Sequence, residues 1–253
     1  MKVRVLGAYG GNTKRTYLTN FLINDVLAMD AGCLTSTLDL EEQYRIRNVL
    51  VSHSHMDHIT SLPFLADNVF GETDETLKIW ASDHVIQCLK KHIFNDVIWP
   101  DFSSIHYEGR PCISFHSLEA FHSYTIAGLQ ITPIPVNHLV PTFAFYVEDA
   151  KSGFLFTSDT TTTDRVWSEM NGKEKLKAII VDCSFPNSLN DLALKSGHMT
   201  PELLAADLKK LNRDCRILVY HAKPSFESQL KQELKDAGLG HIQADIQGEC
   251  FEF

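Results

Sequence analysis

Residues 53 to 58 read His53-Ser54-His55-Met56-Asp57-His58, and they follow directly on the apolar stretch from Val49 to Ser52. In an extended segment the side chains of His53 and His55 point the same way, so two imidazoles can hold one ion. Asp57 and His58 stand where the predicted strand ends and can turn toward a second ion. A loop that merely happened to hold these residues would crowd unsatisfied polar groups at a strand end, which costs free energy. The segment therefore predicts a metal site.

Four ligands cannot complete two metal sites, so the segment predicts further donors elsewhere in the chain. Three candidate residues stand directly after apolar stretches that are typical of strands. They are His138 after the stretch ending at Val136, Asp159 after 154–158, and His221 after 217–220. We expect these three side chains to join the histidine-rich segment.

The composition is typical of a globular chain. Of the 253 residues, 44% are hydrophobic and 22% are charged, and the longest apolar run has five residues, Phe143 to Val147. A membrane-spanning helix needs about 20 apolar residues. The amino-terminal residues lack the apolar segment of a secretion signal, and the six cysteines form no CxxC pair. We therefore expect a cytoplasmic protein with reduced thiols and no membrane partner.

The formal net charge is −9, from 23 basic and 32 acidic side chains. A negative charge of this size opposes the approach of a long polyanion unless basic groups cluster locally. Long nucleic acid is therefore disfavoured as a partner, whereas a small phosphate ester is not.

Apolar alternation predicts strands in both halves of the chain, with helical periodicity between them. The predicted strands are 3–6, 17–23, 26–29, 49–52, 78–81, 126–135, 143–147, 153–157, 178–183 and 217–220, and the predicted helices are 59–68, 83–92, 200–211 and 225–237. Thr200-Pro201 is a typical helix start and Gly238 a typical helix end. Residues 94–124 have the weakest periodicity and are predicted to be mainly loop. With no repeat or linker, we expect one α/β domain over residues 1–253, with two sheets between helices.

The order of these motifs resembles the metallo-β-lactamase fold superfamily. The match runs through 53–58 and then His138, Asp159 and His221, over most of the chain. The resemblance implies a four-layer αββα sandwich with two divalent metal ions at the sheet edge. By that resemblance, His53, His55 and His138 would hold one ion, Asp57, His58 and His221 the other, and Asp159 would bridge them. Imidazole and carboxylate ligands suit Zn²⁺, with Mn²⁺ and Fe²⁺ as alternatives.

Asp159 and His198 narrow the range of reactions that the predicted site could catalyse. Many β-lactamases have a thiol in the place of Asp159, whereas a carboxylate there resembles the phosphodiesterase and glyoxalase branches. His198 lies in Gly197-His198-Met199-Thr200. This segment is similar to an element of the phosphodiesterase branch, including tRNA 3′-processing nucleases, in which an additional histidine contacts the scissile phosphate. The amino terminus of the predicted helix beside it favours an anion. A solvated loop histidine is the alternative interpretation.

Four further segments are similar to the class II cyclic-nucleotide phosphodiesterases. They are 6–11, 92–95 with 98–102, 181–187 and 221–224, which occur in the family's order across most of the chain. The chain departs from the family pattern at Met56, where Leu is usual, and at Asp182, where Glu is frequent. It also departs at 63–67, where the family has small residues and Ser-Pro. None of these departures touches the metal set.

The resemblance implies a metal-dependent phosphoric diester hydrolase acting on a small phosphodiester. A 3′,5′-cyclic nucleotide, cyclic AMP or cyclic GMP, is the leading substrate and would be opened to the 5′-monophosphate. The candidate catalytic residues are Asp57, His198 and Asp182. A hydroxide bridging the two ions would attack phosphorus, and His198 would steady or protonate the leaving oxygen. Asp182 would either orient His198 or simply cap a strand end.

Two other functions stay open. One is a tRNA 3′-processing endonuclease similar to ribonuclease Z, although the chain has neither a Gly/Pro-rich arm between Asp159 and His221 nor a basic cluster. The other is a non-catalytic, metal-bound nucleotide sensor. The resemblance also implies that the chain can form a homodimer.

Overall fold

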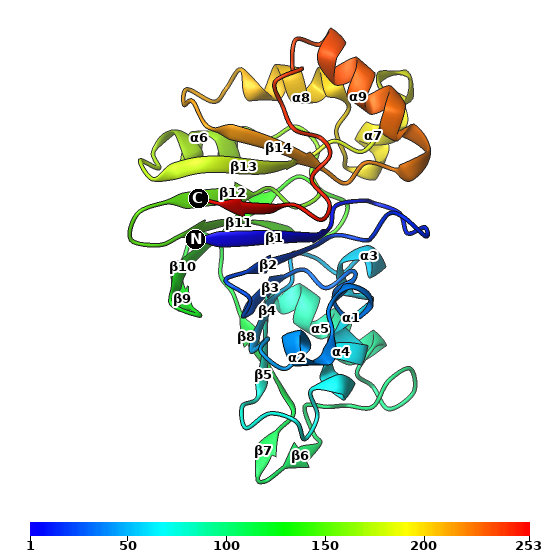
Figure 1. Cartoon of the computed structure of the whole chain (residues 1–253), viewed down its shortest axis with the longest axis vertical. Coiled ribbons are helices and arrows are strands. Elements are labelled where there is room, and N and C mark those ends of the chain that lie inside the picture. The colour runs from blue at the N-terminus through cyan, green and yellow to red at the C-terminus, as the bar shows by residue number, and fades with distance from the viewer.

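Two β-sheets lie face to face in the middle of the molecule, as Figure 1 shows for the computed structural model of residues 1–253. The first sheet has seven strands in the order β15 (Cys250–Glu252), β1 (Lys2–Gly7), β2 (Asn20–Ile23), β3 (Leu27–Met29), β4 (Asn48–Leu50), β5 (Leu77–Ala81) and β8 (Ile113–Ser117). Pairing is antiparallel from β15 to β3 and parallel from β3 to β8. The two termini therefore lie side by side on β1 and β15 (Figure 1).

The second sheet has six strands. Their order is β14 (Arg216–Tyr220), β13 (Leu176–Asp182), β12 (Gly153–Phe156), β11 (Thr142–Glu148), β10 (Leu129–Val136) and β9 (Tyr124–Ile126). The strands β12, β13 and β14 are parallel, so all three end at the same edge of the sheet.

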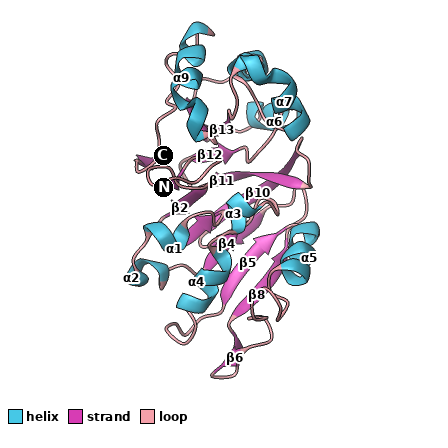
Figure 2. Ribbon diagram, turned by 90° about the vertical axis from the view of Figure 1, so that its right-hand side faces the viewer, coloured by secondary structure: helices cyan, strands magenta, loops and turns pink.

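Helices cover the outer face of each sheet (Figures 1 and 2). On the side of the first sheet lie α1 (Leu34–Thr37), α2 (Leu40–Gln43), α3 (Met56–Ile59), α4 (Leu62–Asn68) and α5 (Asp83–His92). On the side of the second sheet lie α6 (Arg165–Asn171), α7 (Asn190–Ser196), α8 (Pro201–Leu208) and α9 (Glu227–Asp236). Three apolar cores separate these layers, one between the sheets and one under each set of helices. This arrangement confirms the predicted αββα sandwich.

Strand β13 shows why the central run of apolar residues is continuous. Ala178 and Ile180 point into the core between the sheets, whereas Ile179 and Val181 point into the core under the second set of helices. Side chains alternate between the two faces of a strand, and both faces are covered here. A strand buried on both faces needs apolar residues at every position.

The helix signals at the end of the chain are confirmed. The side chain of Thr200 accepts a hydrogen bond from the backbone N–H of Leu203 at the start of α8. Gly238 takes a φ of 78° just after α9, in the left-handed region that ends many helices. No helix in the structure combines the length and the apolar composition needed to cross a membrane.

Several predicted boundaries are wrong. The predicted helix 59–68 is two short helices, α3 and α4, that separate at Thr60 and Ser61. The predicted strand 126–135 is a hairpin, because Ala127 and Gly128 turn with φ values of 51° and 78° between β9 and β10. The predicted loop 94–124 contains β8 and a small hairpin of β6 (His106–Tyr107) and β7 (Arg110–Pro111).

The predicted elements also lack strands that need a distant partner and several short helices. Strand β15 exists by pairing with β1, and β8 by pairing with β5. The helices α1, α2, α6 and α7 have four to seven residues, too short to show a clear apolar period. The structure also contains two 3₁₀ turns, Asn187–Leu189 and Pro224–Phe226.

Candidate active site

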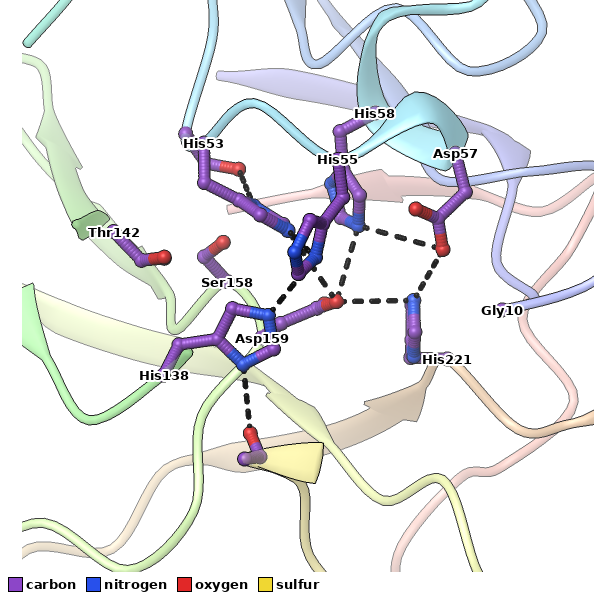
Figure 3. Close-up of polar contacts among 12 residues, drawn as sticks. Gly10, His53, His55, Asp57, His58, His138, Thr142, Ser158, Asp159 and His221 are labelled. Atoms are coloured by element: carbon purple, nitrogen blue, oxygen red, sulfur yellow. Dashed lines mark hydrogen bonds and ion pairs between the residues drawn. The ribbon is translucent and has the colours of Figure 1, made fainter. Parts of the chain in front are cut away.

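The seven predicted metal ligands lie on segments that leave four strands at one edge of the sandwich. The segment 53–58 follows β4, His138 follows β10, Asp159 follows β12, and His221 follows β14. Figure 3 shows their side chains gathered around one centre. They form two groups of close donor atoms, His53 with His55 and His138, and Asp57 with His58, Asp159 and His221. The two groups contain the same residues as the ligand sets that the resemblance implies.

Strained backbone helps to aim residues at this centre. Asp30, Ser158 and His221 have φ values of 57°, 55° and 71°, within two residues of the ends of β3, β12 and β14. A residue other than glycine in this left-handed region costs about 1–3 kcal/mol, and such strain is typical of functional sites. The turn at Ser158 directly precedes Asp159, whereas the side chains of Asp30 and His221 themselves contact the centre.

In the first group, three ring nitrogens meet. Nδ1 of His55 lies 3.1 Å from Nε2 of His53 and 3.2 Å from Nε2 of His138. Two nitrogens bound tetrahedrally to Zn²⁺ stand about 3.3 Å apart, from a metal–nitrogen distance of about 2.0–2.1 Å. His53 is fully buried, and this burial, with the neighbouring His58, holds the pKa of His53 well below its ordinary value. Neutral imidazole is the form that binds a metal.

In the second group, the carboxylate of Asp159 is the common neighbour. Its Oδ2 lies 3.2 Å from Nε2 of His58, 3.2 Å from Nε2 of His221 and 3.7 Å from Nε2 of His53. Oδ2 of Asp57 lies 3.2 Å from Nε2 of His221 on the other side. Oδ1 of Asp159 accepts a hydrogen bond from the hydroxyl of Tyr220 at 2.9 Å. The remaining oxygen of Asp159 therefore faces both groups.

In four of the histidines, Nδ1 lies within hydrogen-bond distance of an acceptor outside the centre. The acceptors are Ser52 Oγ for His53 (3.0 Å), Asp30 Oδ2 for His58 (2.7 Å), the Gly197 carbonyl for His138 (2.9 Å) and Ser184 Oγ for His221 (2.9 Å). Because Ser52 donates its own proton to Asp30, it accepts the proton of His53. With Nδ1–H engaged in this way, each ring can turn the lone pair of Nε2 inward.

A nitrogen lone pair and an ionised carboxylate oxygen 3.2 Å apart repel each other unless a positive charge lies between them. Burial raises the pKa of Asp159, but His221 and His58 outweigh burial and hold that pKa well below its ordinary value. Burial lowers the pKa of His58, but Asp159 and Asp30 outweigh it and raise that pKa well above its ordinary value, so a proton can supply the positive charge. The donor set of nitrogens and carboxylate oxygens fits a divalent metal ion equally well.

His198 and Asp182 stand beside this centre. Nδ1 of His198 donates to Oδ2 of Asp182 at 2.7 Å, and the His198 ring stacks on the ring of His221 with centroids 5.0 Å apart. His198 is held between α7, which is followed by Gly197 with a φ of 72°, and α8, which begins after Thr200. Burial lowers the pKa of His198, but Asp182 outweighs it and the pKa is raised. His198 and Asp182 thus lie directly beside the group that contains Asp57, the third candidate catalytic residue.

Three polar residues around the candidate ligands are not among the residues predicted from the sequence. Asp30 is fully buried and contacts both His58 and Ser52, while Ser52 and Ser184 contact ring nitrogens of the ligands. The signal for Asp30 was a buried strand followed directly by Asp30-Ala31-Gly32, the same pattern that identified Asp159 and His221. Serine after a strand is too common to single out.

A family model described as cAMP phosphodiesterases class-II matches residues 37–235. A probable 3′,5′-cyclic-nucleotide phosphodiesterase of Yersinia pestis is 27% identical over 225 residues, covering 78% of this chain and 62% of that protein. The 3′,5′-cyclic-nucleotide phosphodiesterase 1 of Saccharomyces cerevisiae is 29% identical over 190 residues, covering 66% of this chain and 51% of that protein. The chain thus spans half to three fifths of the length of these curated relatives.

Solved structures show the same fold. The crystal structure of unliganded yeast PDE1 has a TM-score of 0.83 at 20% identity, covering 100% of this chain and 99% of that one. The metallo-beta-lactamase fold protein YhfI from Bacillus subtilis has a TM-score of 0.77 at 21% identity, covering 100% of this chain and 99% of that one. The predicted metallo-β-lactamase fold is confirmed.

Proposed function

The chain belongs to the class-II cAMP phosphodiesterase family, and from this premise we propose that it hydrolyses a 3′,5′-cyclic nucleotide to the 5′-monophosphate. The observation that carries the proposal is the convergence of five histidines and two aspartates on one centre, with the His198–Asp182 pair directly beside it. A centre of this kind can hold a phosphodiester between metal ions and a proton donor.

We propose two divalent ions at the centre, with Zn²⁺ the first choice and Mn²⁺ or Fe²⁺ as alternatives. His53, His55 and His138 would hold one ion, and Asp57, His58 and His221 the other, with Asp159 between them. When bound, such ions polarise a phosphate and supply a hydroxide nucleophile from water at neutral pH. The buried residues Asp30, Ser52 and Ser184, which contact Nδ1 of the histidines, would keep the imidazoles aimed at the ions.

His198 would act on the substrate itself. Its Nδ1 donates to Asp182, so the opposite nitrogen, Nε2, is left to face the reacting phosphate. The raised pKa of His198 favours the protonated ring, which can steady charge on the phosphate or give its proton to the leaving ribose oxygen. Asp182 would stabilise the imidazolium and hold its orientation.

A small substrate agrees with the charge of the chain. The excess of acidic groups, with a formal net charge of −9, disfavours a long polyanion. Ribonuclease Z is one of the more distant relatives, at 25% identity over 161 residues from Metallosphaera sedula. A tRNA precursor therefore belongs among the substrates to be tested.

The test is metal analysis combined with a substrate panel. Purified protein should contain close to two divalent ions and should hydrolyse cyclic AMP or cyclic GMP faster than 2′,3′-cyclic nucleotides, bis(p-nitrophenyl) phosphate or a tRNA precursor. Asp159→Ala is the control and should lose both the ions and the activity. Preference for the tRNA precursor would replace the proposal with a nuclease, and two ions without turnover of any phosphodiester would favour a nucleotide sensor.

A further inference from the structure

Ser184 is a buried serine that contacts both the predicted metal ligand His221 and the His198–Asp182 pair. It follows β13, and its side chain is fully shielded from solvent. Its Oγ lies 2.6 Å from Oδ1 of Asp182, 2.9 Å from Nδ1 of His221 and 3.2 Å from Nδ1 of His198. A serine hydroxyl has a single proton, so at most one of these contacts can be a hydrogen bond that Ser184 donates.

The partners decide where that proton lies. An ionised carboxylate accepts hydrogen bonds but cannot donate them, so the hydroxyl of Ser184 donates to Asp182 across the short 2.6 Å contact. The oxygen of Ser184 is then an acceptor for His221, whose Nδ1 must carry its proton. The other nitrogen of His221, Nε2, lies 3.2 Å from a carboxylate oxygen of Asp57 and of Asp159, and its lone pair is free for a metal ion when Nδ1 alone carries a proton.

Asp182 is the common end point of these contacts. One oxygen accepts from Ser184, and the other accepts from His198 at 2.7 Å and from the backbone N–H of Thr160, next to Asp159, at 3.2 Å. Asp182 is itself fully buried. A single carboxylate thus reaches His198 directly and His221 through one hydroxyl.

We propose that Ser184 is a positioning residue that couples the metal ligand His221 to the His198–Asp182 pair, by fixing His221 in the tautomer with a bare Nε2. The inference rests on the proposed function, because it concerns the same centre. Its consequence is that part of the effect of Asp182 on metal binding passes through the hydroxyl of Ser184, while Asp182 also accepts directly from the backbone of Thr160 beside Asp159.

The test is a double-mutant cycle on metal affinity. The affinity for Zn²⁺ is measured by competition with a chelator for the wild type, Ser184→Ala, Asp182→Asn and the double variant, without any substrate. Each single change should weaken binding about 10-fold to 100-fold, as changes to the partners of metal-bound histidines do. The double variant should bind no more weakly than the weaker single variant, because one path is removed twice. Losses that multiply would overturn the coupling.

Two variants control for packing. Ser184→Thr keeps the hydroxyl and should restore the Zn²⁺ affinity lost in Ser184→Ala. Ser152→Ala removes another buried serine, whose Oγ donates to Asp149 at 3.3 Å near the opposite end of β12, and should leave the affinity unchanged. Equal losses in Ser184→Ala and Ser152→Ala would mean a general packing effect and would overturn the proposal.

A spectroscopic measurement keeps the proposal open to refutation even if Ser184→Ala does not fold. In the Zn²⁺-loaded wild type labelled with ¹⁵N-histidine, His221 should be protonated on Nδ1 and bound through Nε2. The opposite tautomer would refute the inference. Failure of the proposed function is a separate result. Normal turnover with unchanged Zn²⁺ affinity in Ser184→Ala would refute only this inference. The expected Zn²⁺ affinities without any turnover would refute only the proposed phosphodiesterase activity.

Discussion

The imidazole of His58 donates from Nδ1 to Oδ2 of Asp30 at 2.7 Å, and both side chains are fully buried. Asp30 directly follows β3, and His58 lies in α3, which comes after the neighbouring parallel strand β4. The same carboxylate accepts from the backbone and hydroxyl of Ser52, which in turn holds His53. Asp30 therefore supports one histidine from each group of the centre.

Asp30→Asn should weaken metal binding about 10-fold to 100-fold, since the amide cannot accept at both of its polar atoms and one histidine loses its partner. Competition with a chelator measures this loss. Asp25→Asn is the matched control, because Asp25 also has a positive φ but pairs with Lys2 and Arg4 at the surface. Unchanged affinity in Asp30→Asn would show that the buried contact does not orient His58.

His198→Ala should lower kcat on a cyclic nucleotide by about 10²-fold to 10⁴-fold while the protein still holds its ions at saturating metal. The reason is that His198 contacts Asp182 and the ring of His221 but is not one of the seven predicted metal ligands. Kinetics and metal analysis on the same preparation separate the two effects. A variant with wild-type kcat on every phosphodiester tried would exclude His198 from catalysis.

Removal of divalent ions by a chelator should lower the melting temperature. The centre places the buried carboxylate of Asp159 against three histidines, so an ion that binds only the folded chain stabilises it. Free ion at 100 times its dissociation constant contributes about 2.7 kcal/mol. Calorimetry with and without added Zn²⁺ measures the shift. A melting temperature that is the same with and without Zn²⁺ would argue against a metal at this centre.

Gly32→Ala should destabilise the chain by about 1–3 kcal/mol and weaken metal binding, because the added methyl group overpacks the site. A Cβ at this position would lie 2.3 Å from the carbonyl oxygen of Asp57 and 2.7 Å from that of Thr19, so the ligand segment must move. Gly240→Ala is the control, since its Cβ would meet only Lys235 at 3.5 Å or more. Urea unfolding and chelator competition give the two readouts; equal behaviour of the variants would contradict the prediction.

Asp207→Ala should cost about 3 kcal/mol of folding free energy without touching the centre. Asp207 is buried and accepts from the backbone of Thr163 at 3.0 Å and from Nε1 of Trp167 at 2.7 Å, which would both lose their partner. Asp164→Asn removes only the exposed partner of Lys210 and should change stability by less than about 1 kcal/mol. Urea unfolding of the two variants compares the buried and the exposed carboxylate. Similar losses of folding free energy would show that the burial of Asp207 does not decide its contribution.

The sequence by itself determined the layers and the candidate metal ligands. Alternating apolar residues mark β1 and β10 and a continuous apolar run marks β11, because a strand buries one face or both. The candidate ligands follow strands because polar side chains collect where strands leave the core. His53, Asp159 and His221 could be found in this way, since each is identified by its own neighbours in the chain. His198 could be found from a short motif before a capped helix.

Only the tertiary structure decided which buried groups support those ligands and which weak strands form. Asp30 and His58 are 28 residues apart, and Ser184 and His221 are 37 apart, so their contacts exist only after the strands pair and pack. Strands β8 and β15 likewise gain their hydrogen bonds only from β5 and β1. The physical reason is that local sequence sets the conformation of a segment, whereas a hydrogen bond between distant segments depends on the packing of the whole sandwich.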